Sequence, residues 1–277
     1  MIQIGEYNTL EILRETSVGL FLGDEEGNDI LLPNKYVPQE YEIGDTLAVF
    51  CYLDHEERPI ATTLIPKITR NKFALLKVVE VNRIGAFLDW GLEKHLFAPY
   101  KEQARPMEEG KRYLVYAFLD DESNRMVASS KTNQYLSNES LSVELYEEVS
   151  LIVSRFTELG VEVIINELHK GLVYNDEIYA DLKLGQNLKG YIKKIRPDHK
   201  IDVSLQPIGY KNIEPSSQKV LDAIKRNGGF LGLHDKSAPE DVKAILGMSK
   251  KSFKKAIGSL YKDKQILIKE DGITLVD

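Results

Sequence analysis

Six glycines recur at one fixed spacing along most of the chain, and this repeat constrains the fold more than any other feature. The first glycine of each pair follows an alternating apolar segment, and its partner stands 25 residues further on. A hydroxyl residue follows after 19 more residues. The three sets are Gly19, Gly44 and Thr63; Gly85, Gly110 and Ser129; and Gly160, Gly185 and Ser204. Three copies of one register predict three copies of one structural unit.

Each unit contains five short segments with the pattern of β-strands. In the second unit they are ALLKVVEVN, GAFLDW, KHLFAP, RYLVYAFL and RMVASS. They are rich in β-branched and aromatic residues, and turns separate them. Five short strands within about 65 residues predict a small closed barrel, and the OB-fold is the five-stranded barrel of this size.

The three units resemble S1 domains, the RNA-binding subtype of the OB-fold. The resemblance is carried by IGAFL, Gly110 and RMVASS in the second unit, and by KGLVY, Gly185 and KIDVSLQ in the third. The first unit is the most diverged. The resemblance implies that Gly85 allows a sharp bend of the barrel and that Phe87 stands on the outward face, where a base can stack. Ile84 replaces the family's earlier aromatic residue.

The second unit offers both stacking and phosphate-binding candidates. Phe87 matches the stacking aromatic of the family, and Arg125 matches its basic residue before strand five. Lys77, Arg83 and Lys94 are further cations that would contact phosphate. Each stacked base contributes about 1–3 kcal/mol to single-strand binding. The alternative is that Phe87 is a core residue and that the lysines are solvated.

The third unit offers a second set of candidates. Tyr174 stands where the family usually has a strand-three histidine, and the stretch KKIRPDHK is locally basic. Glu162 replaces the stacking aromatic, and Phe156 is a candidate substitute for it. The predicted RNA contacts are Tyr174, Lys193, Lys194, Arg196 and Lys200.

Charge separates the first unit from the others. The whole chain has a formal net charge of −7, but residues 1–66 hold 3 Lys+Arg against 13 Asp+Glu. Residues 67–137 and 216–277 are mildly basic. The first unit keeps Phe21 at the stacking position, yet an acidic surface repels phosphate. We therefore expect a structural or protein-contacting barrel there rather than an RNA reader.

The last sixty residues change from a period of two to a helical period. SSQKVLDAIKRNGG, SAPEDVKAILG and MSKKSFKKAIGSLYKDK predict three helices, with Ser216 or Ser217, Ser237 and Ser249 as N-caps. Asp271 and Gly272 then predict a hairpin turn. Three helices followed by a hairpin predict a winged helix-turn-helix.

The third predicted helix has the recognition position of such a domain. Its lysines lie off the apolar face and suit phosphate contact. They are Lys250, Lys251, Lys254 and Lys255. The N-terminal turns carry no Arg, Asn or Gln to read base edges, so sequence-specific readout has little support. A protein-docking or purely structural role remains the alternative.

Three S1-like units and a winged helix resemble the CvfB/YitL family of bacterial RNA-binding regulators. The match is closest in GAFLDWGL, in GQNLKGYIKKIRPDHKIDVSLQP and in DKSAPEDVKAILGMSKKSFKKAIGSLYK. The resemblance implies single-stranded RNA binding and a post-transcriptional effect on gene expression. The predicted domains are residues 1–66, 67–137, 138–211 and 212–277. The predicted fold class is mainly β, with three tandem OB-fold barrels and a C-terminal α+β winged helix.

The sequence carries no motif of a known catalytic site. It has no G-x-x-x-x-G-K-[ST] phosphate loop and no G-x-S-x-G nucleophile motif. None of its five histidines has metal-ligand spacing. The acidic clusters LDHEE and LDDES read as hairpin tips. We expect a protein that is not an enzyme and that uses no metal and no cofactor.

The remaining sequence features concern the compartment and the partner. Cys51 is the single cysteine, which excludes an internal disulfide and fits the cytoplasm. No apolar run is long enough to span a membrane, and the N-terminus lacks the pattern of a signal peptide. Single-stranded RNA is the expected partner. The two alternatives are a DNA-binding transcription regulator led by the winged helix, and an adaptor that docks on a ribosome or nuclease through its acidic first barrel.

Overall fold

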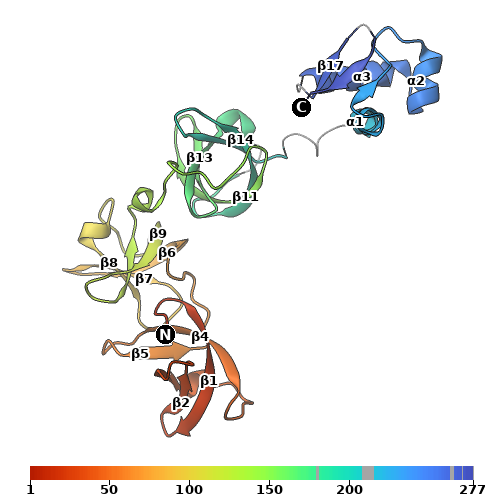
Figure 1. Ribbon diagram of the computed structural model, residues 1–277. Coiled ribbons are helices and arrows are strands. Elements are labelled where there is room, and N and C mark those ends of the chain that lie inside the picture. Colours follow the sequence, from red (N-terminus) through yellow and green to blue (C-terminus); the bar gives the residue numbers. More distant parts are fainter. Residues whose placement is uncertain (179–180, 208–214, 263–264, 270, 277) are drawn as a thin grey trace. The chain divides into compact units, whose positions relative to one another are not determined.

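The computed structural model describes residues 1–178, 181–207, 215–262, 265–269 and 271–276. Three closed five-stranded barrels precede a small helical domain (Figure 1). The predicted fold class is therefore confirmed. Among the described residues, every helix is too short or too polar to span a membrane.

The three barrels share one strand order. The first contains β1 (Tyr7–Thr16), β2 (Gly19–Gly23), β3 (Asp29–Pro33), β4 (Thr46–Leu53) and β5 (Pro59–Thr62). The second contains β6 (Lys72–Val81), β7 (Gly85–Asp89), β8 (Leu96–Pro99), β9 (Arg112–Leu119) and β10 (Met126–Ser129). The third contains β11 (Glu148–Phe156), β12 (Gly160–Ile165), β13 (His169–Tyr174), β14 (Asn187–Ile195) and β15 (Ile201–Ser204). In each barrel, strands three and five run parallel and complete the closure.

The first repeated glycine is required by a neighbouring strand. A Cβ on Gly85 would lie 2.4 Å from the carbonyl oxygen of Ala98 on β8. Its φ of +157° is also unfavourable for residues with a side chain. Gly19 and Gly160 show the same close approach, at 2.1 and 2.0 Å. The close approach of β8 therefore accounts for the glycine, and the bulge of this barrel lies on the neighbouring strand, between Val78 and Glu80.

The second repeated glycine closes a turn onto strand one. The Gly44 N–H donates to the Ile12 carbonyl at 2.8 Å, and the Ile12 N–H donates to the Asp45 carbonyl. A positive φ of 96° at Gly44 permits this turn. Gly110 and Gly185 make the same exchange with Val78 and Val153. The repeat in the sequence is therefore a repeat in backbone hydrogen bonding.

The repeated hydroxyl ends strand five, with one correction in the first barrel. Ser129 Oγ accepts from the Lys131 N–H and donates to the Glu102 carbonyl. In the first barrel Thr62 accepts the corresponding bond from Leu64, while Thr63 donates to the Tyr36 carbonyl. The buried strand-ending residue is thus Thr62 rather than the predicted Thr63. The two hydrogen bonds that Ser129 makes alone are therefore made by two neighbouring threonines in the first barrel.

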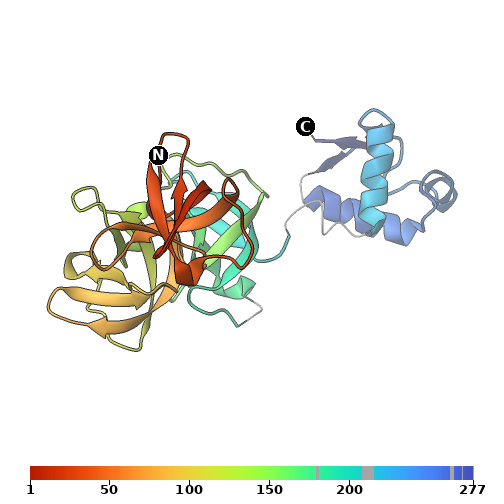
Figure 2. The same cartoon turned by 90° about the horizontal axis from the view of Figure 1, so that it is seen from below.

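The C-terminal domain has the three predicted helices and the predicted hairpin, and a short strand that was not predicted lies between the first two helices (Figure 2). It comprises α1 (Pro215–Arg226), β16 (Phe230–Leu231), α2 (Pro239–Leu246), α3 (Lys250–Lys262), β17 (Ile266–Ile268) and β18 (Ile273–Leu275). Its core joins the apolar faces of the three helices to the strands.

The predicted helix caps are partly correct. Ser249 precedes α3 and accepts the Ser252 N–H at 3.1 Å, as an N-cap does. Ser237 is not a cap, because α2 begins after Ala238 and the Ser237 hydroxyl accepts from His234 instead. Ser217 lies within α1, and its hydroxyl donates to the Ala256 carbonyl of α3.

Candidate nucleic-acid interface

One outward position recurs on the second strand of each barrel, two residues after the repeated glycine. A bulge in strand one places a further residue opposite it, so each barrel presents a pair of side chains there. The pairs are Phe21 with Arg14, Phe87 with Glu80, and Glu162 with Arg155. The three barrels therefore share a backbone arrangement but differ in the chemistry of this face.

The second barrel has an aromatic groove at this face. Phe87 and Phe97 face each other across β7 and β8, with ring centres 5.2 Å apart and planes inclined by 36°. Both are half-buried and line a groove of about 420 Å³. Ile84, which is 60% exposed, lies at the same groove. Phe87 thus lies in the groove rather than among the buried core residues of this barrel.

The predicted cations of the second barrel separate into two groups. Arg125 and Lys94 line the groove, and both form ion pairs with Glu57 of the first barrel at 2.9 Å. Lys77 and Arg83 are exposed but do not line it. The structure therefore brings Arg125 to Phe87 and leaves Lys77 and Arg83 outside the groove.

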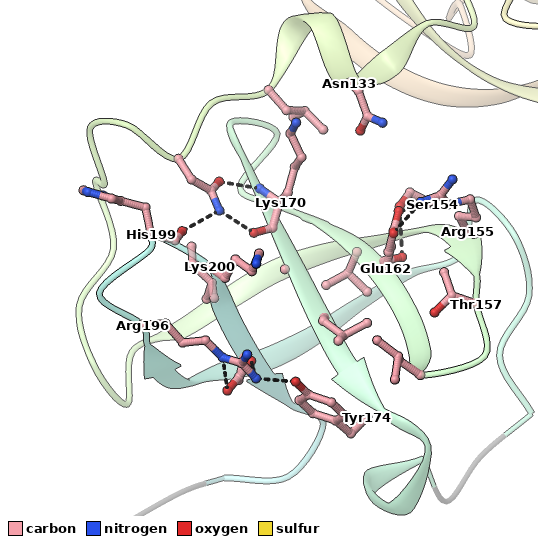
Figure 3. Close-up of a pocket in the computed structure, with 18 of the residues that line it drawn as sticks. Asn133, Ser154, Arg155, Thr157, Glu162, Lys170, Tyr174, Arg196, His199 and Lys200 are labelled. Carbon is pink, nitrogen blue, oxygen red and sulfur yellow. Dashed lines mark hydrogen bonds and ion pairs between the residues drawn. The ribbon is translucent and has the colours of Figure 1, made fainter.

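The third barrel has a larger groove, of about 790 Å³, on the corresponding face (Figure 3). Arg196 forms a two-point ion pair with Asp202, at 3.1 and 2.9 Å, and donates to the Tyr174 hydroxyl. The Asp202 carboxylate raises the pKa of Arg196 above its usual value. Two predicted contacts, Tyr174 and Arg196, are therefore joined in one network on the groove wall.

Lysines at the third barrel differ in their pairing. Lys200 lines the groove and pairs with Asp198 at 2.8 Å. Lys170 also lines it and makes no ion pair among the described residues, and Figure 3 shows it extending toward the segment that carries Asn133. Lys193 and Lys194 are exposed on β14, away from the groove lining.

The position predicted for a stacking aromatic in the third barrel is occupied by an ion pair. Arg155 contacts both carboxylate oxygens of Glu162, at 3.0 and 2.6 Å. Phe156, the candidate substitute, is 52% exposed but does not line the groove. This groove therefore offers hydrogen-bonding and charged groups where the second barrel offers two rings.

In the first barrel, an arginine side chain covers the aromatic ring at the outward position. The Arg14 guanidinium lies 4.1 Å from the centre of the Phe21 ring, and Arg14 pairs with Asp29 at 2.7 Å. A stacked base on this ring face would have to displace the guanidinium. The ring face that would receive a base is therefore occupied by a cation of the same barrel.

Helix α3 presents most of its predicted lysines to solvent. Lys251, Lys254 and Lys255 are exposed, and Lys250 is half-buried. The opposite face buries Phe253, Ala256, Ile257 and Leu260, which the helical spacing predicted. The helix therefore has a basic outer face and an apolar inner face.

Several residues of the two grooves were not predicted from the sequence. Phe97 had a detectable signal, because it alternates with buried Leu96 and Ala98 on β8. Glu57 had no such signal in the sequence, because its role depends on the contact between the first and second barrels. The Asn138 side chain amide donates to the carbonyls of Lys170 and His199 and so holds the linker at the groove. Among the described residues, no three His, Cys, Asp or Glu are grouped to hold a metal ion.

Two protein-family models match parts of the chain. Residues 4–64 match the S1 domain family, and residues 218–275 match the CvfB-like winged helix domain. "Conserved virulence factor B" of Staphylococcus epidermidis is 27% identical over 98% of this chain and 94% of its own length. Over nearly its whole length the chain is similar to proteins of the CvfB/YitL family. YitL of Bacillus subtilis is 28% identical over 98% of this chain and 92% of its own.

A solved structure aligns with nearly the whole of this chain. It is a multidomain protein with nucleic acid binding domains from Streptococcus pneumoniae, 26% identical, covering 99% of this chain and 98% of its own, with a TM-score of 0.45. The matched S1 and winged helix domains are nucleic-acid-binding types and are not catalytic.

Proposed function

We propose that this protein binds single-stranded RNA through the grooves of its second and third barrels and regulates gene expression after transcription. The observation that carries the proposal is the pair of half-buried rings, Phe87 and Phe97, that lines the second groove. Aromatic rings in a groove stack on bases without regard to sequence, which suits a single strand. We expect no catalysis and a cytoplasmic location.

The third groove supports the same function with different chemistry. Tyr174 and Arg196 provide a phenol ring and a guanidinium plane, both of which stack on unpaired bases. Lys170 and Lys200 provide cations beside them for phosphate. RNA offers 2′-hydroxyls that hydrogen-bond to carboxylates and amides, so the polar groove favours RNA over DNA.

The test is fluorescence anisotropy with single-stranded RNA, single-stranded DNA and duplex DNA of equal length, each at two salt concentrations. Single-stranded RNA should bind most tightly. Phe87→Ala should weaken this binding about tenfold, as expected for the loss of one stacked base. Tyr261→Ala, which removes a 55% exposed ring from α3, is the control and should leave RNA binding unchanged. Equal binding by wild type and Phe87→Ala would contradict the proposal.

Duplex DNA is the second candidate ligand, and the basic face of α3 favours it. Lysine side chains contact phosphates without reading sequence, so this binding would be nonspecific and strongly salt-dependent. Tighter binding to duplex DNA than to RNA, lost in the Lys251→Ala/Lys254→Ala variant, would promote this candidate. Binding to none of the three nucleic acids would favour a protein partner at the acidic first barrel.

A further inference from the structure

The turn between β4 and β5 of the first barrel forms one wall of the groove on the second barrel. His55 and Glu57 from this turn line the groove together with Phe87, Phe97 and Arg125. The groove that carries the stacking pair is therefore not built by one barrel alone.

Glu57 holds both cations of this groove. Its Oε1 lies 2.9 Å from Lys94 Nζ, and its Oε2 lies 2.9 Å from Arg125 Nε. Lys94 also donates to the Asp54 carbonyl at 2.7 Å. One carboxylate thus bridges two cations in the way that a phosphate group bridges them in a nucleic-acid complex.

The backbone at Glu57 adds a second observation. Its φ is +63°, in the left-handed region. The corresponding turns of the other barrels have Asn124 at +57° and His199 at +59°. Asparagine and histidine are enriched in this conformation, whereas glutamate is not. Backbone preference therefore does not explain the glutamate at this position, whereas the two ion pairs of its side chain do.

The meeting of the two barrels is a packed contact that holds Glu57 in place. The Trp90 ring lies edge-on to Phe50 and Tyr52 of the first barrel, with ring centres 5.7 and 6.2 Å apart. Lys35 of the first barrel pairs with Glu93 of the second. This buried aromatic interface therefore holds the acidic turn against the groove.

We propose that Glu57 is a specificity-determining residue of the second barrel's groove. Its carboxylate occupies the place of a phosphate between Lys94 and Arg125, so the groove admits an uncharged base against Phe87 and Phe97 and keeps the backbone phosphates outside. The inference rests on the proposed RNA-binding function of this groove. It assigns to the acidic first barrel a direct effect on RNA affinity at the second.

The test compares Glu57→Gln with the wild type for binding to an unstructured RNA oligonucleotide across a salt series. Glutamine keeps the shape of the side chain but frees two cations for phosphate. Binding should tighten about threefold to tenfold, and the salt slope should steepen by about 0.7 for each phosphate gained. Glu56→Gln is the matched control, because Glu56 is exposed, pairs with Arg58 and does not line the groove.

Two further measurements keep the outcomes distinct. Emission of the single tryptophan, Trp90, reports whether the interface is intact in each variant, and Glu57→Ala should act in the same direction as Glu57→Gln. Long-chain inorganic polyphosphate, which has charges but no bases, should bind Glu57→Gln more tightly than wild type.

If wild type binds RNA in a Phe87-dependent way and Glu57→Gln binds equally or more weakly, the inference is wrong and the proposed function stands. If neither protein binds RNA, the proposed function is wrong, and polyphosphate decides the inference. A gain of polyphosphate binding in Glu57→Gln then supports the phosphate-like role of Glu57, and no gain overturns it.

Discussion

At the scale of single residues, a repeated glycine can be required for two reasons. A neighbouring strand can leave no room for a Cβ, or the backbone φ can be unfavourable for residues with a side chain. Gly85 meets both a close neighbour and an unfavourable φ, while Gly110 has a φ of +81° and open space around it. The first requirement cannot be relieved without moving β8. The second costs only the strain of a left-handed residue, about 1 kcal/mol.

We therefore expect Gly85→Ala to lower the free energy of unfolding of the barrel by about 2–4 kcal/mol, because the new Cβ would overlap the Ala98 carbonyl. Gly110→Ala should cost about 1 kcal/mol. Urea unfolding followed by Trp90 emission measures both. Equal losses for the two variants would show that conformation, not the close approach of β8, makes Gly85 necessary.

The same residues show how far sequence reasoning reaches. Spacing located Gly85, and strand periodicity places Phe87 on the same strand face two residues further along. The resemblance to S1 domains implied that this face points outward. The resemblance also implied bending as the reason for the glycine, because the distance between β7 and β8 is set only in the closed barrel. The spacing also chose Thr63 over Thr62, because the β4–β5 connection of the first barrel is one residue shorter than the β9–β10 connection of the second.

At the scale of elements, the helices of the winged domain were predicted more accurately than their caps. An amphipathic period is repeated over several turns, so it survives local exceptions. A cap depends on one hydroxyl and on where the chain enters the helix. Ser249 meets that condition and Ser237 does not, although both precede a helix in the sequence.

Replacing the cap of α3 tests this distinction. Ser249→Ala should destabilise the winged domain by about 1 kcal/mol, because the Ser252 N–H loses its acceptor. The circular dichroism signal at 222 nm during thermal unfolding measures it, since the described α-helices all lie in this domain. Ser259→Ala on the exposed face of α3 is the matched control and should stabilise slightly. A cap variant with an unchanged midpoint would contradict the assignment.

At the scale of the whole molecule, the grooves could not be derived from the separate units. The charge of each unit distinguished a strongly acidic first barrel from a mildly basic second barrel. It did not indicate that an acidic turn of that barrel would neutralise Arg125 and Lys94. That arrangement depends on the contact between Trp90 and Phe50, whose partners are 40 residues apart in the chain. A contact between two repeats produces no recurring pattern in the sequence of either repeat, so the spacing of residues could not predict it.

We expect this contact to make the first two barrels unfold as one cooperative unit, and replacing Phe50 tests this expectation. Phe50 lies on β4 of the first barrel, is fully buried and belongs to the same apolar cluster as Trp90, which is 2% exposed. Phe50→Ala should cost about 3–5 kcal/mol and shift Trp90 emission to longer wavelength in the folded protein, as water reaches the indole. Steady-state fluorescence and urea unfolding measure the two effects. Phe253→Ala, an equally buried phenylalanine of the winged domain, should leave Trp90 emission unchanged. Unaltered emission in Phe50→Ala would show that the barrels do not depend on each other through this ring.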